Sequence, residues 1–212
     1  MEKSRPFDAR SEKDTYLPCI LHYWRAMGGQ DAVSDNLGVT PQVIEMSTLG
    51  DDLIEAAMSG DVVKVRRLVA NGADVNYANR LGVTPLMVAA QWNRPNIVSF
   101  LLSKHADVET KENSSGCNAL IFACVSGNSD IVGLILAHGA HVNSTNRDGR
   151  TALMTASFRG AIAVVKVLLS HGAHIDAVDR FGATPLTEAS MAGHRDVVTL
   201  LMSKRADKAR KC

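Results

Sequence analysis

A phrase of about 33 residues recurs along this chain, and it restricts the possible folds more than any other feature of the sequence. Its clearest copies lie at 79–102, 146–169 and 179–202. Each copy runs from a glycine through Thr-Pro-Leu or Thr-Ala-Leu to a pair of small residues, and then to β-branched residues followed by leucines. A fixed period of this length predicts a row of similar units that stack on one another, instead of a fold around one central core.

Two positions that move in step define the register of the repeat. The leucine of the Thr-Pro-Leu element recurs at steps of 34, 33 and 33 residues, and the alanine that opens each inter-unit segment recurs at steps of 33, 34, 33 and 33. The positions are Leu86, Leu120, Leu153 and Leu186, and Ala73, Ala106, Ala140, Ala173 and Ala206. The step of 34 places one additional residue near 113–115, where the tip of a surface loop would tolerate it.

Each unit is predicted to contain two short helices with a turn between them. In the first unit, apolar residues at helical spacing follow a break at Gly60, and Asn71-Gly72 is typical of a left-handed helix end. Asp52 with Glu55 three residues later has the form of an N-terminal capping box. The Gly and Asn residues between units suit tight turns. The expected fold is all-α: a solenoid of about five helix–turn–helix units with short β-hairpin turns between them.

The units resemble ankyrin repeats, whose pattern is a β-turn and two antiparallel helices around a Thr-Pro-Leu-His-x-Ala core. The core is spelled Thr-Pro-Leu-Met-Val-Ala at 84–89 and Thr-Pro-Leu-Thr-Glu-Ala at 184–189, with looser copies at 118–123 and 151–156. The histidine of the family pattern is missing from every copy. The resemblance covers about residues 51–207 and implies units at about 51–78, 79–111, 112–145, 146–178 and 179–207.

Two segments flank the units. Residues 1–50 are interpreted as an N-terminal arm, whose apolar stretch at 16–24 is either part of a flexible arm or a segment that docks on the first unit or on a partner. The letters Leu-Gly-Val-Thr-Pro at 37–41 return at 81–85, either as a vestigial hairpin or by coincidence. Residues 208–212 are interpreted as a basic tail.

Composition argues against several classes of function. A net charge of +1 predicts no general attraction to nucleic acid or membranes, and no apolar run is long enough to span a bilayer. The N-terminus lacks the apolar core of a signal peptide, and the four cysteines follow no repeating pattern. Reduced thiols without a signal peptide predict a cytoplasmic protein, with the nucleus as a second compartment.

No constellation of residues predicts catalysis or metal binding. The sequence has no phosphate-binding loop, no nucleophile with an oriented base and no paired carboxylates, so we expect neither an enzyme nor a cofactor nor a small-molecule substrate. The spacings His138-x-x-His141 and His171-x-x-His174 lack a third and fourth ligand for a zinc site.

The resemblance implies that a protein or peptide partner binds the concave face, which the hairpin tips and the first helix of each unit would form. Aromatic residues and arginines gather at those positions. Trp and Arg are enriched at interface hot spots, and arginine pairs bidentately with carboxylates, so a partner with acidic groups is favoured. We therefore predict a protein–protein interaction module: an adaptor, scaffold or regulatory subunit. The predicted partner-binding residues are Arg80, Leu81, Trp92, Arg147, Arg150, Phe158, Arg159, Arg180 and Phe181.

Alternatives remain open at this stage. The aromatic side chains could pack between units while the arginines are only solvated, or the arginines and the basic tail could serve a regulatory protein that binds nucleic acid or a membrane surface. Asn76 and Asn143 match a family position that can be hydroxylated. The last helix is spelled like an internal one, which predicts weak self-association through the last unit.

Overall fold

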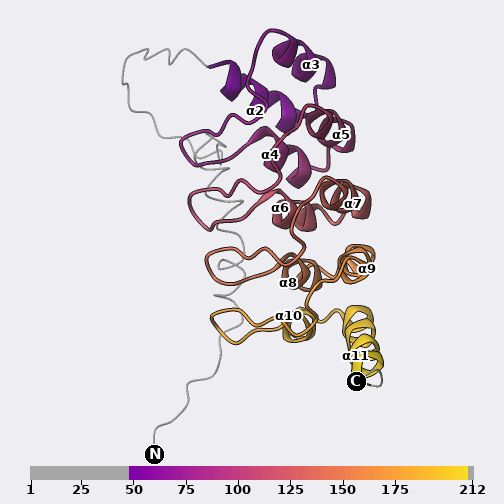
Figure 1. Cartoon of the computed structure of the whole chain (residues 1–212). Coiled ribbons are helices and arrows are strands. Elements are labelled where there is room, and N and C mark those ends of the chain that lie inside the picture. Colours follow the sequence, from indigo (N-terminus) through magenta and orange to yellow (C-terminus); the bar gives the residue numbers. More distant parts are fainter. Residues whose placement is uncertain (1–47, 210–212) are drawn as a thin grey trace, which may run out of the picture. The chain divides into compact units, whose positions relative to one another are not determined.

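The computed structural model describes residues 48–209, with side chains up to residue 205, and this range forms five consecutive pairs of helices (Figure 1). The predicted all-α solenoid is confirmed there. The predictions for 1–47 and 210–212 lie outside the described residues. The pairs are α2 (Leu49–Ser59) with α3 (Val62–Ala70), α4 (Pro85–Gln91) with α5 (Pro95–Ser103), α6 (Ala119–Ser126) with α7 (Ser129–Ala137), α8 (Ala152–Phe158) with α9 (Ile162–Ser170), and α10 (Pro185–Met191) with α11 (Arg195–Ala209).

The first helices of the later pairs begin where a polar side chain satisfies a free backbone N–H group. Thr84, Asn118, Thr151 and Thr184 each accept a hydrogen bond from the N–H three residues on. A helix cannot pair these N–H groups itself, so the cap stabilises it by about 1 kcal/mol. A proline at the first position of α4 and α10 removes no bond, because that N–H has no partner within the helix.

The beginning of α2 differs from the sequence prediction. The helix begins at Leu49, and its N-cap is Thr48, whose hydroxyl accepts the N–H of Asp51 at 3.2 Å. The capping box predicted at Asp52 and Glu55 is therefore wrong. Asp52 lies within the first turn, where its negative charge favours the positive end of the helix dipole.

The apolar core lies between successive pairs of helices. On the first helices, Leu86, Leu120 and Leu153 are at most 1% exposed, and α4, α6 and α8 each pack against the next first helix. The equivalent Leu186 of the last pair is only half-buried. Burial of one leucine contributes about 1.5–3 kcal/mol, and in this array the neighbouring unit provides much of that burial. Stability is consequently a property of the interfaces between units.

The chain between pairs forms tips that are closed by their own backbone. In three tips the N–H of an Asx residue donates to the carbonyl four residues on at 3.0–3.1 Å, and its side-chain oxygen accepts the N–H groups two and four residues on at 2.9–3.0 Å. These Asx residues are Asn79, Asn146 and Asp179. Within residues 48–209 the only β pairing is an isolated bridge between Thr145 and Thr151, so the predicted hairpins are tight tips with almost no strand.

The tip with one additional residue uses Glu112 in place of Asx. Its backbone N–H reaches the carbonyl of Cys117, five residues on, at 3.0 Å. Its carboxylate is 3% exposed and accepts the N–H groups of Ser114, Ser115 and Cys117. The longer side chain thus matches the longer loop. Burial alone would raise the pKa of Glu112, but hydrogen bonds from the Ser114 and Ser115 hydroxyls and from the Cys117 and Ser114 N–H groups outweigh it and hold the pKa below its usual range.

The second pair contains two non-glycine residues with positive φ. Asn93 (φ 55°) stands where other pairs have Gly60, Gly127, Gly160 and Gly193, and His105 (φ 61°) stands where they have Gly72, Gly139 and Gly172. A side chain with a Cβ atom costs about 1–2 kcal/mol in the left-handed region, although Asn tolerates it better than most residues. His105 is therefore a position of backbone strain.

Replacement His105→Gly is expected to raise the free energy of unfolding by about 0.5–1 kcal/mol, because the gain in backbone freedom at positive φ exceeds the entropy that glycine adds to the unfolded chain. Thermal or urea unfolding of the full chain would measure it. The matched control is Asn71→Gly, since Asn71 is the C-cap of α3 with φ −85°, and there glycine should be neutral or destabilising. Equal effects of the two substitutions would contradict the assignment of strain.

The end of α11 also differs from the prediction, which began a basic tail at residue 208. The helix continues to Ala209. Arg205 stands where three other pairs have a left-handed glycine, and a residue with a Cβ atom favours continued right-handed helix. The Arg205 guanidinium lies 2.7 Å from a carboxylate oxygen of Asp176, which ties α11 to the segment between α9 and the last tip.

Candidate protein-binding surface

The tips and the first helices form one continuous side of the array, which we call the tip face (Figure 1). It comprises the tips at 79–83, 112–117, 146–150 and 179–183 together with α4, α6, α8 and α10. Each tip is bonded to the one before it. The N–H groups of Asn113, Arg147 and Arg180 donate to carbonyl groups of the preceding tip at 2.8–2.9 Å. The tip face is therefore held in a fixed shape, which lowers the entropic cost of binding.

A second row of bonds joins the units at the base of the tips. The Oδ1 atoms of Asn76 and Asn143 accept the N–H groups of Asp107 and His174 in the next unit, at 2.7 and 2.8 Å. Glu109 performs the same role toward His141 at 2.7 Å. The two asparagines that match the hydroxylation position of the family thus carry inter-unit hydrogen bonds, and their hydroxylation stays a prediction.

Four predicted arginines lie at the surface of the tip face. Arg80, Arg147 and Arg159 are exposed, and Arg147 donates to the Ser114 carbonyl at 3.3 Å. The Arg180 guanidinium pairs with Asp148 of the preceding tip at 2.8 Å while its side chain stays 60% exposed. Internal partners orient Arg147 and Arg180, and both side chains keep solvent-facing surface for a ligand.

The predicted aromatic residues differ in how far they are exposed. Phe181 is 68% exposed and its ring lies under the Arg180 guanidinium, 4.6 Å from the ring centre. Trp92 at the end of α4 is 39% exposed, and Leu81 is 36% exposed. Phe158 is half-buried. Arg180 and Phe181 are thus in contact, whereas Trp92 and Phe158 lie on α4 and α8, which are separated by α6.

Arg150 does not face solvent as its predicted position in a tip implied. Its side chain is only 14% exposed, and its guanidinium lies 2.7 Å from the carboxylate of Glu188 and 3.5 Å from that of Asp179. Those two carboxylate side chains are 0% and 1% exposed. Arg150 is the cation of a buried ionic cluster that joins the last unit to the one before it, so we remove it from the candidate surface.

The repeat pattern contains a signal for this cluster. The position of Arg150 holds Val83 and Cys117 in two earlier units, and these are 7% and 5% exposed. The position of Glu188 holds Val88, Phe122 and Thr155. A charged residue at a position that is otherwise apolar implies a buried partner of opposite charge.

Two exposed apolar residues near the last tip were not among the predicted binding residues. Val178, which directly precedes that tip, is 60% exposed, and Met191 at the end of α10 is 54% exposed. Val178 stands where other units have Ala78, Lys111 and Thr145, so an apolar residue at a polar or small position was the available signal. They extend the apolar part of the tip face at its last unit.

The outer side of the last pair is partly polar. Thr187 and Ser190 are exposed at positions where earlier units bury Met154 and Ser157. On α11, however, Met202 is 57% exposed, whereas the equivalent Leu102 is 2% exposed. The first helix of the last unit therefore has an end-cap character that the second helix lacks. Self-association through this end stays a prediction.

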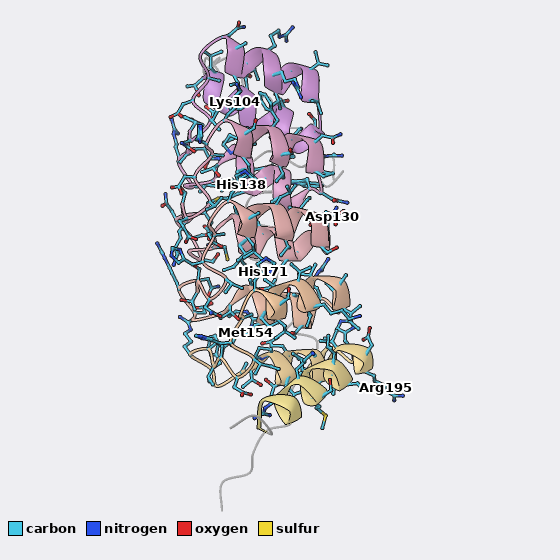
Figure 2. The ribbon with its side chains drawn as sticks, turned by 45° about the vertical axis from the view of Figure 1, so that its right-hand side comes forward. Lys104, Asp130, His138, Met154, His171 and Arg195 are labelled. Atoms are coloured by element: carbon cyan, nitrogen blue, oxygen red, sulfur yellow. The ribbon has the colours of Figure 1, made fainter. Side chains whose placement is uncertain are left out.

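His138 and His171 lie at the ends of second helices, outside the tip face. The Nδ1 atoms of His138 and His171 lie 2.8 Å from helix carbonyl groups four residues before them, at the ends of α7 and α9 (Figure 2). In the described part of the chain no three His, Cys, Asp or Glu side chains gather as metal ligands would. Cys117 and Cys124 are buried, and burial raises the pKa of the Cys124 thiol. None of the described helices is both long and apolar enough to cross a membrane.

Comparison with known proteins agrees with this architecture. The model of the family described as ankyrin repeats (3 copies) matches residues 53–146 and 142–212. The chain therefore belongs to the ankyrin repeat family, whose repeats generally mediate protein–protein interaction and are not themselves catalytic.

The curated relatives are much longer than the matched region. The ankyrin repeat and KH domain-containing protein mask-1 of Caenorhabditis elegans is 35% identical over 99 residues, which is 47% of this chain and 4% of that protein. The ankyrin repeat and SAM domain-containing protein 6 of Rattus norvegicus is 35% identical over 92 residues, or 43% of this chain and 10% of that protein. A shorter stretch of 55 residues is 49% identical to the mitochondrial disaggregase of Bos taurus, covering 26% of this chain and 8% of that protein. Each of these matches covers less than half of this chain and no more than a tenth of the relative.

Proposed function

We propose that this protein is an adaptor, scaffold or regulatory subunit whose tip face binds a partner protein or peptide with acidic groups. The observation that carries the proposal is the exposure of Trp92, Phe181 and Leu81 beside exposed arginines on a face whose shape is fixed by inter-tip hydrogen bonds. Trp and Arg are enriched at interface hot spots, and exposed apolar side chains that gather on one face mark binding sites. The proposed binding residues are Arg80, Leu81, Trp92, Arg147, Phe158, Arg159, Arg180 and Phe181.

The experiment is quantitative capture of partners by the full chain and by Trp92→Ala/Arg159→Ala. Two hot-spot truncations of about 1–2 kcal/mol each should reduce recovery of a genuine partner at least tenfold. The matched control is Val63→Ala/Lys166→Ala, which also removes one exposed apolar side chain and one exposed cation, but from the second helices α3 and α9. Recovery that is unchanged by the tip-face pair, or reduced equally by the control pair, would refute the proposal.

The same assay separates the alternative of nucleic-acid or membrane-surface binding. That mode depends on phosphate neutralisation, so its affinity falls steeply with salt. Binding through the tip face should respond to Trp92→Ala at constant salt. Recovered nucleic acid that survives Trp92→Ala would favour the alternative.

A further inference from the structure

A groove of about 550 Å³ lies between the second helices α3 and α5, which are separated from the tips by the first helices (Figure 1). Its lining follows α5 from Asn96 to Lys104. Eight residues of α-helix rise about 12 Å, the length of about four residues of extended peptide. The groove therefore has room for a short peptide segment, and none of its lining residues belongs to the tip face.

Two cations border this groove, and one aromatic ring holds both of them in place. The Arg66 guanidinium lies 4.9 Å from the centre of the Phe100 ring, and the Lys104 ammonium lies 5.9 Å from it (Figure 2 labels Lys104). Attraction to the face of the ring orients each cation without neutralising its charge. A guanidinium stacked in this way keeps its N–H groups at the edge, where a carboxylate can accept them.

The described residues that line the groove supply no counter-charge. No acidic residue lines it, and neither α3 nor α5 contains Asp or Glu. Among the described residues, neither Arg66 nor Lys104 lies within ion-pair distance of a carboxylate, whereas nearby Lys64 is paired with Glu55 at 3.2 Å. The positive potential of the groove is therefore available to an anionic ligand.

This combination occurs once in the array. The positions of Arg66, Phe100 and Lys104 hold Ser99, Leu134 and His138 between α5 and α7, and Gly133, Val167 and His171 between α7 and α9. Between α9 and α11 they hold Lys166, Leu200 and Lys204, two cations without the ring. The repeat itself does not require the set, because the other second helices pack without it.

We propose that the α3–α5 groove binds an acidic peptide segment of a partner protein, one that carries at least two carboxylates around an apolar residue. Arg66 and Lys104 pair with the carboxylates, and Phe100 with Val62 contacts the apolar side chain. The exposed Asn96 and Ser99 are positioned along the groove to bond peptide backbone. This site is independent of the proposed function, since it shares no residue with the tip face.

The test uses the full chain and a fluorescein-labelled peptide with two glutamates on each side of a leucine, followed by fluorescence anisotropy at an ionic strength of about 0.05 M. Arg66→Gln/Lys104→Gln should weaken binding at least tenfold, because two charge-assisted contacts are lost. Phe100→Leu, which introduces the residue of the next unit, should weaken it by about two- to fivefold through loss of the ring. Melting temperatures near the wild-type value would show that the variants are folded.

The matched control is Lys166→Gln/Lys204→Gln, which makes the same change in net charge at the equivalent repeat positions. It should change the affinity less than twofold. Equal weakening by both pairs, or equal binding of a peptide with glutamine for glutamate, would overturn the proposal. A phosphoserine peptide that binds more than tenfold more tightly than the glutamate peptide would overturn the choice of occupant. Trp92→Ala/Arg159→Ala should leave this binding unchanged, so failure here and failure of the tip-face proposal are distinguishable.

Discussion

Replacement Arg150→Ala is expected to lower the free energy of unfolding by about 3–5 kcal/mol, because it leaves two buried carboxylates without their cation. Glu188 and Asp179 lie 2.7 and 3.5 Å from the guanidinium in the wild type and have almost no access to water. Since the cluster joins the last two units, hydrogen exchange in residues 179–205 should accelerate most, and urea unfolding of the whole chain would measure the total loss.

Two comparisons make this prediction specific. Arg159→Ala removes an exposed arginine and should change stability by no more than about 0.5 kcal/mol. The triple variant Arg150→Val/Asp179→Asn/Glu188→Val introduces the residues that occupy the equivalent positions of the second unit, which are Val83, Asn79 and Val88. An apolar replacement of a buried ion pair is often neutral, so the triple variant should recover at least about 2 kcal/mol relative to Arg150→Ala. If the triple variant is no more stable than Arg150→Ala, the loss in Arg150→Ala does not come from the unpaired carboxylates of Asp179 and Glu188.

Replacement Glu112→Asn is expected to cost about 2–3 kcal/mol, because the shorter side chain cannot reach all the N–H groups of a tip that is one residue longer than the others. Deletion of Ser114 in the same variant shortens this tip to the four-residue spacing that separates Asn146 from Arg150 in the next tip. The deletion should therefore recover most of the lost stability. A deletion variant that is less stable than Glu112→Asn alone would contradict the matching of side-chain length to loop length.

The pH dependence of stability provides a second readout for Glu112. Hydrogen bonds to the carboxylate lower its pKa in the folded chain, so it stabilises the fold above its ordinary pKa of 4.5, and this contribution is lost as the pH falls through the lower folded value. Urea unfolding at several pH values below 4.5 should show a shallower pH dependence for the Glu112→Asn deletion variant than for the wild type. Asp107, whose pKa is also lowered by hydrogen bonds from Glu109 and Thr110, should contribute equally in both proteins.

Much of the fold was predictable because the same local sequence pattern recurs in several units. Thr84, Thr151 and Thr184 recur in register, and each caps a first helix. The beginning of α2 was not predicted, because its N-cap Thr48 lies before the first clear unit at residue 51. No equivalent residue in another unit indicated where this helix begins. The additional residue near 113–115 was located by counting, but its accommodation by Glu112 required the geometry of the tip.

The binding surface was less predictable than the fold, because exposure depends on neighbours that are distant in sequence. Arg150 and Arg147 are three residues apart in one tip, yet the first pairs with Glu188, 38 residues on, and the second stays exposed. Similarly, the groove beneath Arg66 required Phe100, which comes from the next unit. The repeat pattern cannot predict these contacts between units, because they form only where the units differ in sequence.

The sequence alone determined that the chain stacks as ankyrin repeats, since spacing and helix caps are local properties that each unit repeats. The tertiary structure decided which charged residues lie in the interior and which face solvent. The physical reason is that the desolvation of a charge depends on the whole surroundings of the side chain. The side chain of Arg150 is only 14% exposed because carboxylates of the adjacent unit lie against it, whereas Phe181 is 68% exposed.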